Sequence, residues 1–355
     1  MTPIVLGVEG LTLTAAERDF LSDAKPWGVI LFRRNIDSPH QLARLTEAVR
    51  AAGVAHVLID QEGGRVARLG RPHWRVMPRP AAFAALYARN PALGLAACRL
   101  NHRLCAHDLH AVGIDIDLAP DLDVARETTF WAHGDCRTFG RTPAPVAALG
   151  RAACDGLLAG GVLPVIKHMP GHGGATEDSH TDLPVIDLDA EVLAAVDFAP
   201  FAALADMPAG LIAHVDYPGL DPARRPATFS PKVIGGAIRG RIGFDGLLLT
   251  DDLFMDALTG SYEDRIAGAL AAGCEMPLFC HGDLRARARA VAAVPPPPAE
   301  TAARIARAEA AIAPPEPFNA DAAARDLAEM LAPVWSLEDE DWEETAFNPR
   351  LSLQG

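Results

Sequence analysis

The sequence predicts an α/β fold, a single (β/α)8 TIM barrel with a C-terminal helical extension. Short apolar runs of β type alternate with helical stretches rich in Ala, Leu and Arg, which is the pattern of a parallel sheet covered by helices. Polar and titratable residues follow the apolar runs at one end only, as expected where the carboxyl ends of barrel strands carry the site. A chain of 355 residues is long enough for one such barrel and an extension.

The elements follow from this alternation in chain order. We predict strands from the apolar runs at 5–8, 28–32, 56–60, 114–118, 163–168, 210–215, 246–251 and 275–280. Helical spacing of apolar residues predicts helices at about 15–23, 39–52, 80–112, 144–159, 189–206, 231–239, 262–272 and 283–293.

The prolines at 295–298 end the repeating pattern. Two further helices are expected after them, at about 299–312 and 321–332, and the chain then turns acidic. We therefore divide the chain into a catalytic barrel (1–295), a helical extension packed on the barrel (296–335) and an acidic tail (336–355).

Composition narrows the classes of partner. A net charge of −14 and a pI near 5.3 argue against nucleic acid or an anionic membrane. The sequence shows neither a signal peptide nor an apolar run of the roughly 18 residues that a membrane span needs. The six Cys lack metal-type spacing and are expected to be buried free thiols. We expect a monomeric cytoplasmic protein that needs no cofactor.

The segment 167–180 carries an unusual density of titratable groups directly after an apolar run. Loops after strands are where rigid scaffolds place their chemistry. His168, His172 and His180 suggest a metal, but Pro170 and the glycines of the segment make unlikely the helix that would align two of them on one ligand. We therefore predict no metal site. His172 is expected to brace the loop.

Two carboxylates and one imidazole are the candidates for bond-breaking chemistry. Asp251 follows the apolar run 246–249, where a carboxylate can attack an electrophilic carbon or stabilise a cation. For Asp252, the same chemistry and a helix N-cap both remain open. Asp178 lies two residues before His180, so it can orient that imidazole as a proton donor and acceptor.

The run DQEGGRVARL (60–69) places a carboxylate, a glycine turn and two Arg after another strand. Such groups can bind sugar hydroxyls or form a salt bridge, and the run alone does not decide between them.

Together, four motifs resemble glycoside hydrolase family 3, in particular its compact bacterial β-N-acetylglucosaminidases. The motifs are DQEGGRVARL (60–69), KHMPGHG with DSH (167–180), AHVDYPGLDP (213–222) and TDDLFMDAL (250–258). The resemblance implies a retaining mechanism through a covalent glycosyl-enzyme, with Asp251 as nucleophile and His180, tuned by Asp178, as acid/base. It also implies that five residues bind the non-reducing sugar: Asp60, Arg68, Arg137, Lys167 and His168.

The implied function is removal of terminal N-acetylglucosamine (GlcNAc) from cell-wall fragments, the GlcNAc-anhydroMurNAc peptides of peptidoglycan recycling. The chain departs from the family pattern at 127–137 and at Asp216, where an apolar residue is expected. A metal-dependent hydrolase on the same scaffold and a catalytically silent sugar-binding protein remain as alternatives. Whether water or phosphate accepts the glycosyl group also stays open.

Overall fold

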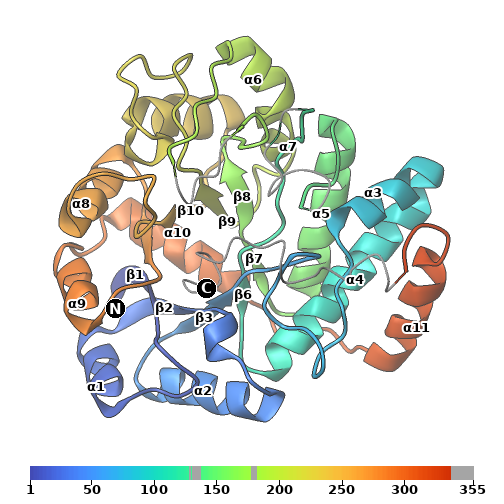
Figure 1. The fold of residues 1–355 in the computed structure, drawn as a ribbon, viewed down its shortest axis with the longest axis horizontal. Coiled ribbons are helices and arrows are strands. Elements are labelled where there is room, and N and C mark those ends of the chain that lie inside the picture. The colour runs from blue at the N-terminus through green and yellow to red at the C-terminus, as the bar shows by residue number, and fades with distance from the viewer. Residues whose placement is uncertain (128, 130–136, 177–181, 337–355) are drawn as a thin grey trace.

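The computed structural model describes residues 1–127, 129, 137–176 and 182–336. Within these residues, parallel strands form a barrel surrounded by helices (Figure 1). The barrel strands are β1 (Thr2–Gly7), β2 (Pro26–Leu31), β3 (His56–Ile59), β6 (Ile116–Asp117), β7 (Leu163–Pro164), β8 (Ile166–Met169), β9 (Ala209–Ile212), β10 (Leu247–Asp252) and β11 (Met276–Phe279).

The strand order closes the sheet into a ring. The hydrogen-bonded order runs β7-β6-β3-β2-β1-β11-β10-β9-β8, and its two ends are consecutive in the chain, separated only by Val165. The N–H of Val165 donates to the carbonyl of Asp117, and Lys167 forms a parallel bridge with Asp121. The segment 163–169 therefore acts as one barrel strand in two pieces, and the predicted (β/α)8 fold is confirmed.

Helices cover the outside of this ring (Figure 1). They are α1 (Ala15–Ala24), α2 (Pro39–Ala51), α3 (Pro80–Arg89), α4 (Pro91–Ala111), α5 (Pro143–Ala159), α6 (Ala190–Val196), α7 (Phe198–Ala203), α8 (Tyr262–Ala272) and α9 (Leu284–Ala292). Two short segments, Arg33–Asn35 and Ala227–Phe229, are 3-10 helices, and Val233–Ile242 is a π-helix.

Alternation along the strands produces two apolar layers. In β1, Val5 packs inside the barrel, whereas Ile4 and Leu6 pack between the strands and the outer helices. The same division places Ile30 of β2 and Leu58 of β3 inside. Because both faces are covered, the strands are apolar throughout, as parallel strands usually are.

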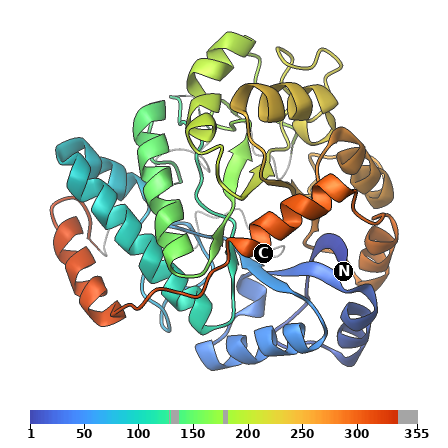
Figure 2. The same cartoon turned by 180° about the vertical axis from the view of Figure 1, so that it is seen from behind.

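The amino ends of the strands are covered by α10 (Ala299–Ala310), which crosses the barrel in Figure 2. Ile305 and Ala308 join the interior cluster, and the indole N–H of Trp27 donates to Glu309 at 2.9 Å. The last described helix, α11 (Ala320–Leu331), packs against α4. Because α10 covers the amino end of the barrel, a site is expected at the opposite, carboxyl end.

Two predicted helices prove to be divided. The stretch 80–112 breaks into α3 and α4 at Asn90, because Pro91 lacks an N–H and disfavours the helical conformation of the residue before it; Asn90 is extended and caps α4. The stretch 189–206 breaks into α6 and α7 at Asp197. The strand predicted at 163–168 is likewise interrupted at Val165.

The cysteine prediction agrees with the described residues, where Cys98, Cys105, Cys154, Cys274 and Cys280 are buried free thiols. Cys136 lies outside them. In the same part of the chain, no helix combines the length and the apolar character that crossing a membrane requires.

Candidate active site

The predicted site residues within the described chain lie at the carboxyl ends of barrel strands. Lys167 and His168 belong to β8, and Asp251 lies near the end of β10. Asp60 directly follows β3. In a parallel barrel these strand ends share one rim, so residues more than 100 positions apart in the sequence come together.

Arg68 reaches this rim through a hairpin that the sequence analysis did not predict. The short strands β4 (Gln61–Gly63) and β5 (Val66–Ala67) pair antiparallel. Gly63 has φ 100°, and a Cβ there would lie 2.4 Å from the Pro78 carbonyl oxygen, so the turn requires glycine. The Gln61 side-chain oxygen accepts the N–H groups of Arg68 and Leu69 at 2.8 and 2.9 Å. Gln61 therefore holds Arg68 next to Asp60.

Lys167 bridges two carboxylates at the centre of the site. Its Nζ lies 2.8 Å from Asp60 Oδ1 and 2.6 Å from Glu62 Oε1, and Arg68 lies 3.3 Å from the other Asp60 oxygen. Burial alone would raise the pKa of Asp60, but Lys167 and Arg68 outweigh it and hold that pKa well below the ordinary value. Asp60 therefore stays ionised and can accept hydrogen bonds from sugar hydroxyls.

Glu62 is a residue of this network to which the sequence analysis assigned no role. Its carboxylate binds Arg137 through two bonds, Nε to Oε2 at 2.9 Å and Nη2 to Oε1 at 2.8 Å. Burial opposes its ionisation, yet Arg137 and Lys167 hold its pKa below the ordinary value. Glu62 thus anchors Arg137, which the sequence placed in the site only by resemblance. The sequence did offer a sign of this role, since Glu62 lies only two residues after Asp60.

His168 contacts both this network and a second pair of acids. Its Nε2 lies 3.4 Å from Arg137 Nη2, and its Nδ1 lies 2.8 Å from Asp123 Oδ2. Burial lowers the pKa of His168 to about 4 and raises the pKa of Asp123 to about 6, so at neutral pH a neutral imidazole faces a carboxylate.

The second pair of acids, Asp121 and Asp123, was missed. Asp121 accepts the Asp123 N–H at 2.8 Å and lies 3.7 Å from Arg137. Burial raises its pKa well above the ordinary value, and the Asp123 charge adds to that effect. An acid–Leu–acid run, three residues after the end of the strand predicted at 114–118, was the sequence signal that pointed to them.

The two consecutive aspartates of β10 have different surroundings. Asp251 is half-buried and close enough for its charge to act on His168. The Asp252 carboxylate instead accepts the N–H groups of Cys280 and Phe254, both at 3.0 Å, and lies 2.8 Å from His281. Of the two roles left open for Asp252, these contacts favour a structural one, because its oxygens tie β10 to β11.

His214 and Asp216 have structural contacts as well. The His214 Nδ1 lies 2.6 Å from Thr228 Oγ1, and its Nε2 lies 3.1 Å from the Asp252 carbonyl oxygen. Asp216, where an apolar residue was expected, is ion-paired with Arg224. The pairing explains how this position accommodates a buried charge.

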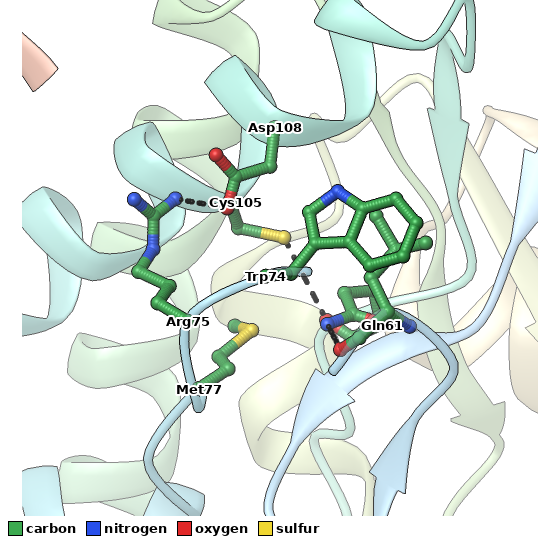
Figure 3. Close-up of a pocket in the computed structure, with 7 residues that line it drawn as sticks. Gln61, Trp74, Arg75, Met77, Cys105 and Asp108 are labelled. Atoms are coloured by element: carbon green, nitrogen blue, oxygen red, sulfur yellow. Dashed lines mark hydrogen bonds and ion pairs between the residues drawn. The ribbon is translucent and has the colours of Figure 1, made fainter. Parts of the chain in front are cut away.

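A small pocket lies behind the hairpin, between it and α4 (Figure 3). Gln61, Trp74 and Met77 line one side, and Cys105 and Asp108 line the other, with Arg75 paired to Asp108. Because Gln61 points here and also holds Arg68, packing in this pocket supports the position of the site residues.

Asp178 and His180 lie outside the described residues. Elsewhere in the site, Asp123, His168 and His172 place one potential metal-ligating atom each within 4.8 Å of one another. Asp123 is already bonded to His168 Nδ1 and to the backbone N–H of His172. Hydrogen bonds thus engage both Asp123 oxygens and the His168 ring, whereas His172 contributes its backbone N–H rather than its ring to this contact.

The comparison with protein families agrees with the barrel and its rim of charged residues. The profile described as "Glycosyl hydrolase family 3 N terminal domain" matches residues 5–310. The chain belongs to glycosyl hydrolase family 3. This family match covers all the site residues named above.

Two curated relatives, both named Beta-hexosaminidase, illustrate the likeness within family 3. The protein from Alkalilimnicola ehrlichii is 40% identical over 285 residues, which are 79% of this chain and 80% of the relative. The protein from Xanthomonas axonopodis pv. citri is 40% identical over 287 residues, covering 79% and 84%. The prediction of a glycoside hydrolase related to the β-N-acetylhexosaminidases is confirmed.

Solved structures show the same fold. NagZ from Neisseria gonorrhoeae, in complex with N-trifluoroacetyl-D-glucosamine, has a TM-score of 0.82 and 30% identity, covering 93% of this chain and 98% of its own. The β-N-acetylhexosaminidase from Beutenbergia cavernae has a TM-score of 0.72 and 28% identity, covering 93% and 96%. The likeness therefore extends over nearly the whole length of both enzymes.

Proposed function

We propose that this family 3 chain is a retaining exo-β-N-acetylglucosaminidase that removes terminal GlcNAc from peptidoglycan-derived muropeptides in the cytoplasm. The observation that carries the proposal is that one network of contacts, completed by Glu62, joins the predicted sugar-binding residues Asp60, Arg68, Arg137, Lys167 and His168. Asp251 is close enough for its charge to act on His168. The names of the curated relatives and the glucosamine derivative bound by the gonococcal NagZ support the sugar.

The charges suit the recognition of a neutral sugar. The ionised carboxylate of Asp60 accepts hydroxyl hydrogens, while Lys167 and Arg68 donate to hydroxyl oxygens. Each charge is already balanced by a partner 2.6–3.3 Å away. A sugar therefore enters a prearranged set of donors and acceptors, and little reorganisation is needed on binding.

Asp251 is assigned the role of nucleophile. A glycosidic bond breaks when the leaving oxygen is protonated and a carboxylate attacks the anomeric carbon from the opposite face. Asp251 then forms an ester with that carbon, and the leaving oxygen departs with a proton from His180. His180 next takes a proton from water, which attacks the anomeric carbon and restores the Asp251 carboxylate.

The decisive experiment traps the glycosyl-enzyme with a 2-acetamido-5-fluoro glycosyl inhibitor and maps the adduct by mass spectrometry. We expect the label on the peptide that contains Asp251. Asp252→Asn is the matched control, since Asp252 is the adjacent carboxylate with structural contacts; it should still be labelled, and Asp251→Asn should not. A label elsewhere, or none in an active enzyme, would reject the assignment.

His180, oriented by Asp178, is assigned the acid/base role. Aglycones that need protonation depend on the acid, whereas activated aryl groups leave without it. Replacing His180 by Gln should therefore slow a poor leaving group far more than an activated aryl glycoside. Equal losses on both substrates would count against the assignment.

Three alternatives have separate outcomes. A metal-dependent hydrolase would lose activity on chelation, and a silent sugar-binding protein would bind GlcNAc without turnover. A phosphorylase would release the aryl group faster with added phosphate and would form the sugar phosphate. The substrate itself is tested by incubating the enzyme with GlcNAc-anhydroMurNAc peptide and following the release of free GlcNAc.

A further inference from the structure

We propose that Asp123 is a positioning residue that joins sugar binding to catalysis, because one carboxylate holds both His168 and the base of the loop that leads to Asp178 and His180. The inference rests on the proposed function and adds a residue to it. Asp123 lies in the segment after β6. In the chain, α5, β7 and β8 separate this segment from that loop.

The two oxygens of Asp123 have different partners. Oδ2 lies 2.8 Å from Nδ1 of His168, and Oδ1 accepts the backbone N–H of His172 at 2.6 Å. Asp123 is fully buried, and His168 and His172 are nearly so. Neither bond is exchanged readily for water, and the loss of one partner would leave a buried group unsatisfied.

The same segment continues along the loop after Asp123. Thr129 Oγ1 donates to the carbonyl of Gly173, and a Cβ on Gly173 would lie only 2.0 Å from the Val124 carbonyl oxygen. Arg126 pairs with Asp197, at the junction of α6 and α7. Residues 123–127 and 129 therefore pack against the start of the loop, and Asp123 among them also bonds His168.

The bond to His168 sets the position of a proton. A carboxylate oxygen accepts, so Nδ1 of His168 carries the hydrogen and Nε2 is left as an acceptor. This matches Arg137, whose N–H donors face Nε2 at 3.4 Å. Asp123 therefore presents His168 to the sugar rim in one tautomer.

Two substitutions separate the two contacts. In Asp123→Asn, the amide oxygen can still accept from His172, but the amide NH2 now faces His168 Nδ1 and forces the proton onto Nε2, against the donors of Arg137. In Asp123→Ala, both contacts are lost. Thr129→Val serves as a control that removes a contact with the start of the loop without touching His168. His168→Gln serves as one that alters the sugar contact and leaves the bond from the His172 N–H to Asp123 in place.

The assay compares aryl N-acetyl-β-glucosaminides with a good and a poor leaving group. For Asp123→Asn we expect KM to rise on the order of 10-fold for both, with an unchanged ratio of their kcat values. For Asp123→Ala we expect the KM effect and, in addition, a kcat loss on the order of 10- to 100-fold that is confined to the poor leaving group. Thr129→Val should reproduce only the kcat effect, and His168→Gln only the KM effect.

A spectroscopic readout is independent of activity. ¹⁵N NMR of the imidazole rings should show His168 as the Nδ1–H tautomer in the wild type and as Nε2–H in Asp123→Asn, with the signal assigned by its absence in His168→Gln. Equal behaviour of Asn and Ala, or an unchanged tautomer, would overturn the inference. If the wild type does not turn over either substrate, the proposed function fails instead, whatever the tautomer.

Discussion

Glu62 offers the sharpest test of how the site is held together. Glu62→Gln keeps the shape of the side chain but removes the charge that faces Arg137 and Lys167, whose side chains are only 10% and 4% exposed. Removal of one partner from a buried ion pair costs about 3–5 kcal/mol, because the other charge stays buried without compensation. Lys167 keeps Asp60 at 2.8 Å, which places the expected loss near the lower end, about 3 kcal/mol.

The measurement is thermal unfolding followed by circular dichroism. With an unfolding entropy of about 2.1 cal/mol/K per residue, a loss of this size lowers the Tm of a chain of this length by about 4 °C. The matched control is Glu191→Gln, whose carboxylate is 83% exposed and pairs with Arg241 at the surface. Because surface pairs contribute about 0–1 kcal/mol, the control should change Tm much less. Equal shifts in the two variants would refute the reasoning.

The pH dependence supplies a second check on Glu62. Its pKa is lower in the folded protein than the ordinary value, which is about 4.3 when unfolded. Ionised Glu62 therefore stabilises the fold fully above that value, and the contribution is lost as the pH falls through the folded pKa. The stability difference between wild type and Glu62→Gln should be constant from pH 7 to about 5 and shrink below about 4.

Three further predictions concern acid stability, metal removal and the far end of the barrel. Because the pKa of His168 falls to about 4 in the fold, the wild type should lose up to about 3 kcal/mol between pH 6.5 and 4; denaturant unfolding of His168→Gln should lack this part of the loss. Dialysis against EDTA should leave hydrolysis unchanged; a loss reversed by zinc would support a metal at Asp123, His168 and His172. Glu275→Gln, which removes a partner of Arg239 and Arg304 beneath the barrel, should lower Tm and leave KM unaltered; a raised KM would show that α10 influences the site.

Most elements could be read from local patterns. The alternation of buried strands and amphipathic helices predicted the barrel, because each strand must be apolar on both faces and each helix on one. The breaks at Asn90 and Val165 were missed for different reasons. Asn90 precedes a proline, and the effect of that proline competes with a strong helical pattern. The interruption of the strand at Val165 depends on which neighbouring strand each part of the segment 163–169 pairs with.

Part of the candidate site could be predicted from local patterns as well. Asp60, Lys167 and Asp251 stand directly at the ends of apolar runs, where chemistry is expected in a barrel. Arg68 stood in a run whose Arg side chains could bind a sugar or form a salt bridge, and the family resemblance chose the first role. Arg137 entered through the resemblance alone, because nothing in its neighbouring residues indicates which carboxylate it contacts. Asp121, Asp123 and Glu62 lie close to the ends of predicted strands, but their roles were missed. The role of a buried acid depends on the partners that compensate its charge, and the sequence does not show those partners.

By itself, the sequence determined the fold class, the family and the rim on which the functional groups lie, because periodicity and short motifs are local properties of the chain. Only the tertiary structure decided which charges compensate one another. Lys167 meets Asp60 and Glu62, His168 meets Asp123, and Asp252 binds Cys280 and His281 after β11. Electrostatic and hydrogen-bond energies fall steeply with distance, and these distances are set by the closing of the barrel.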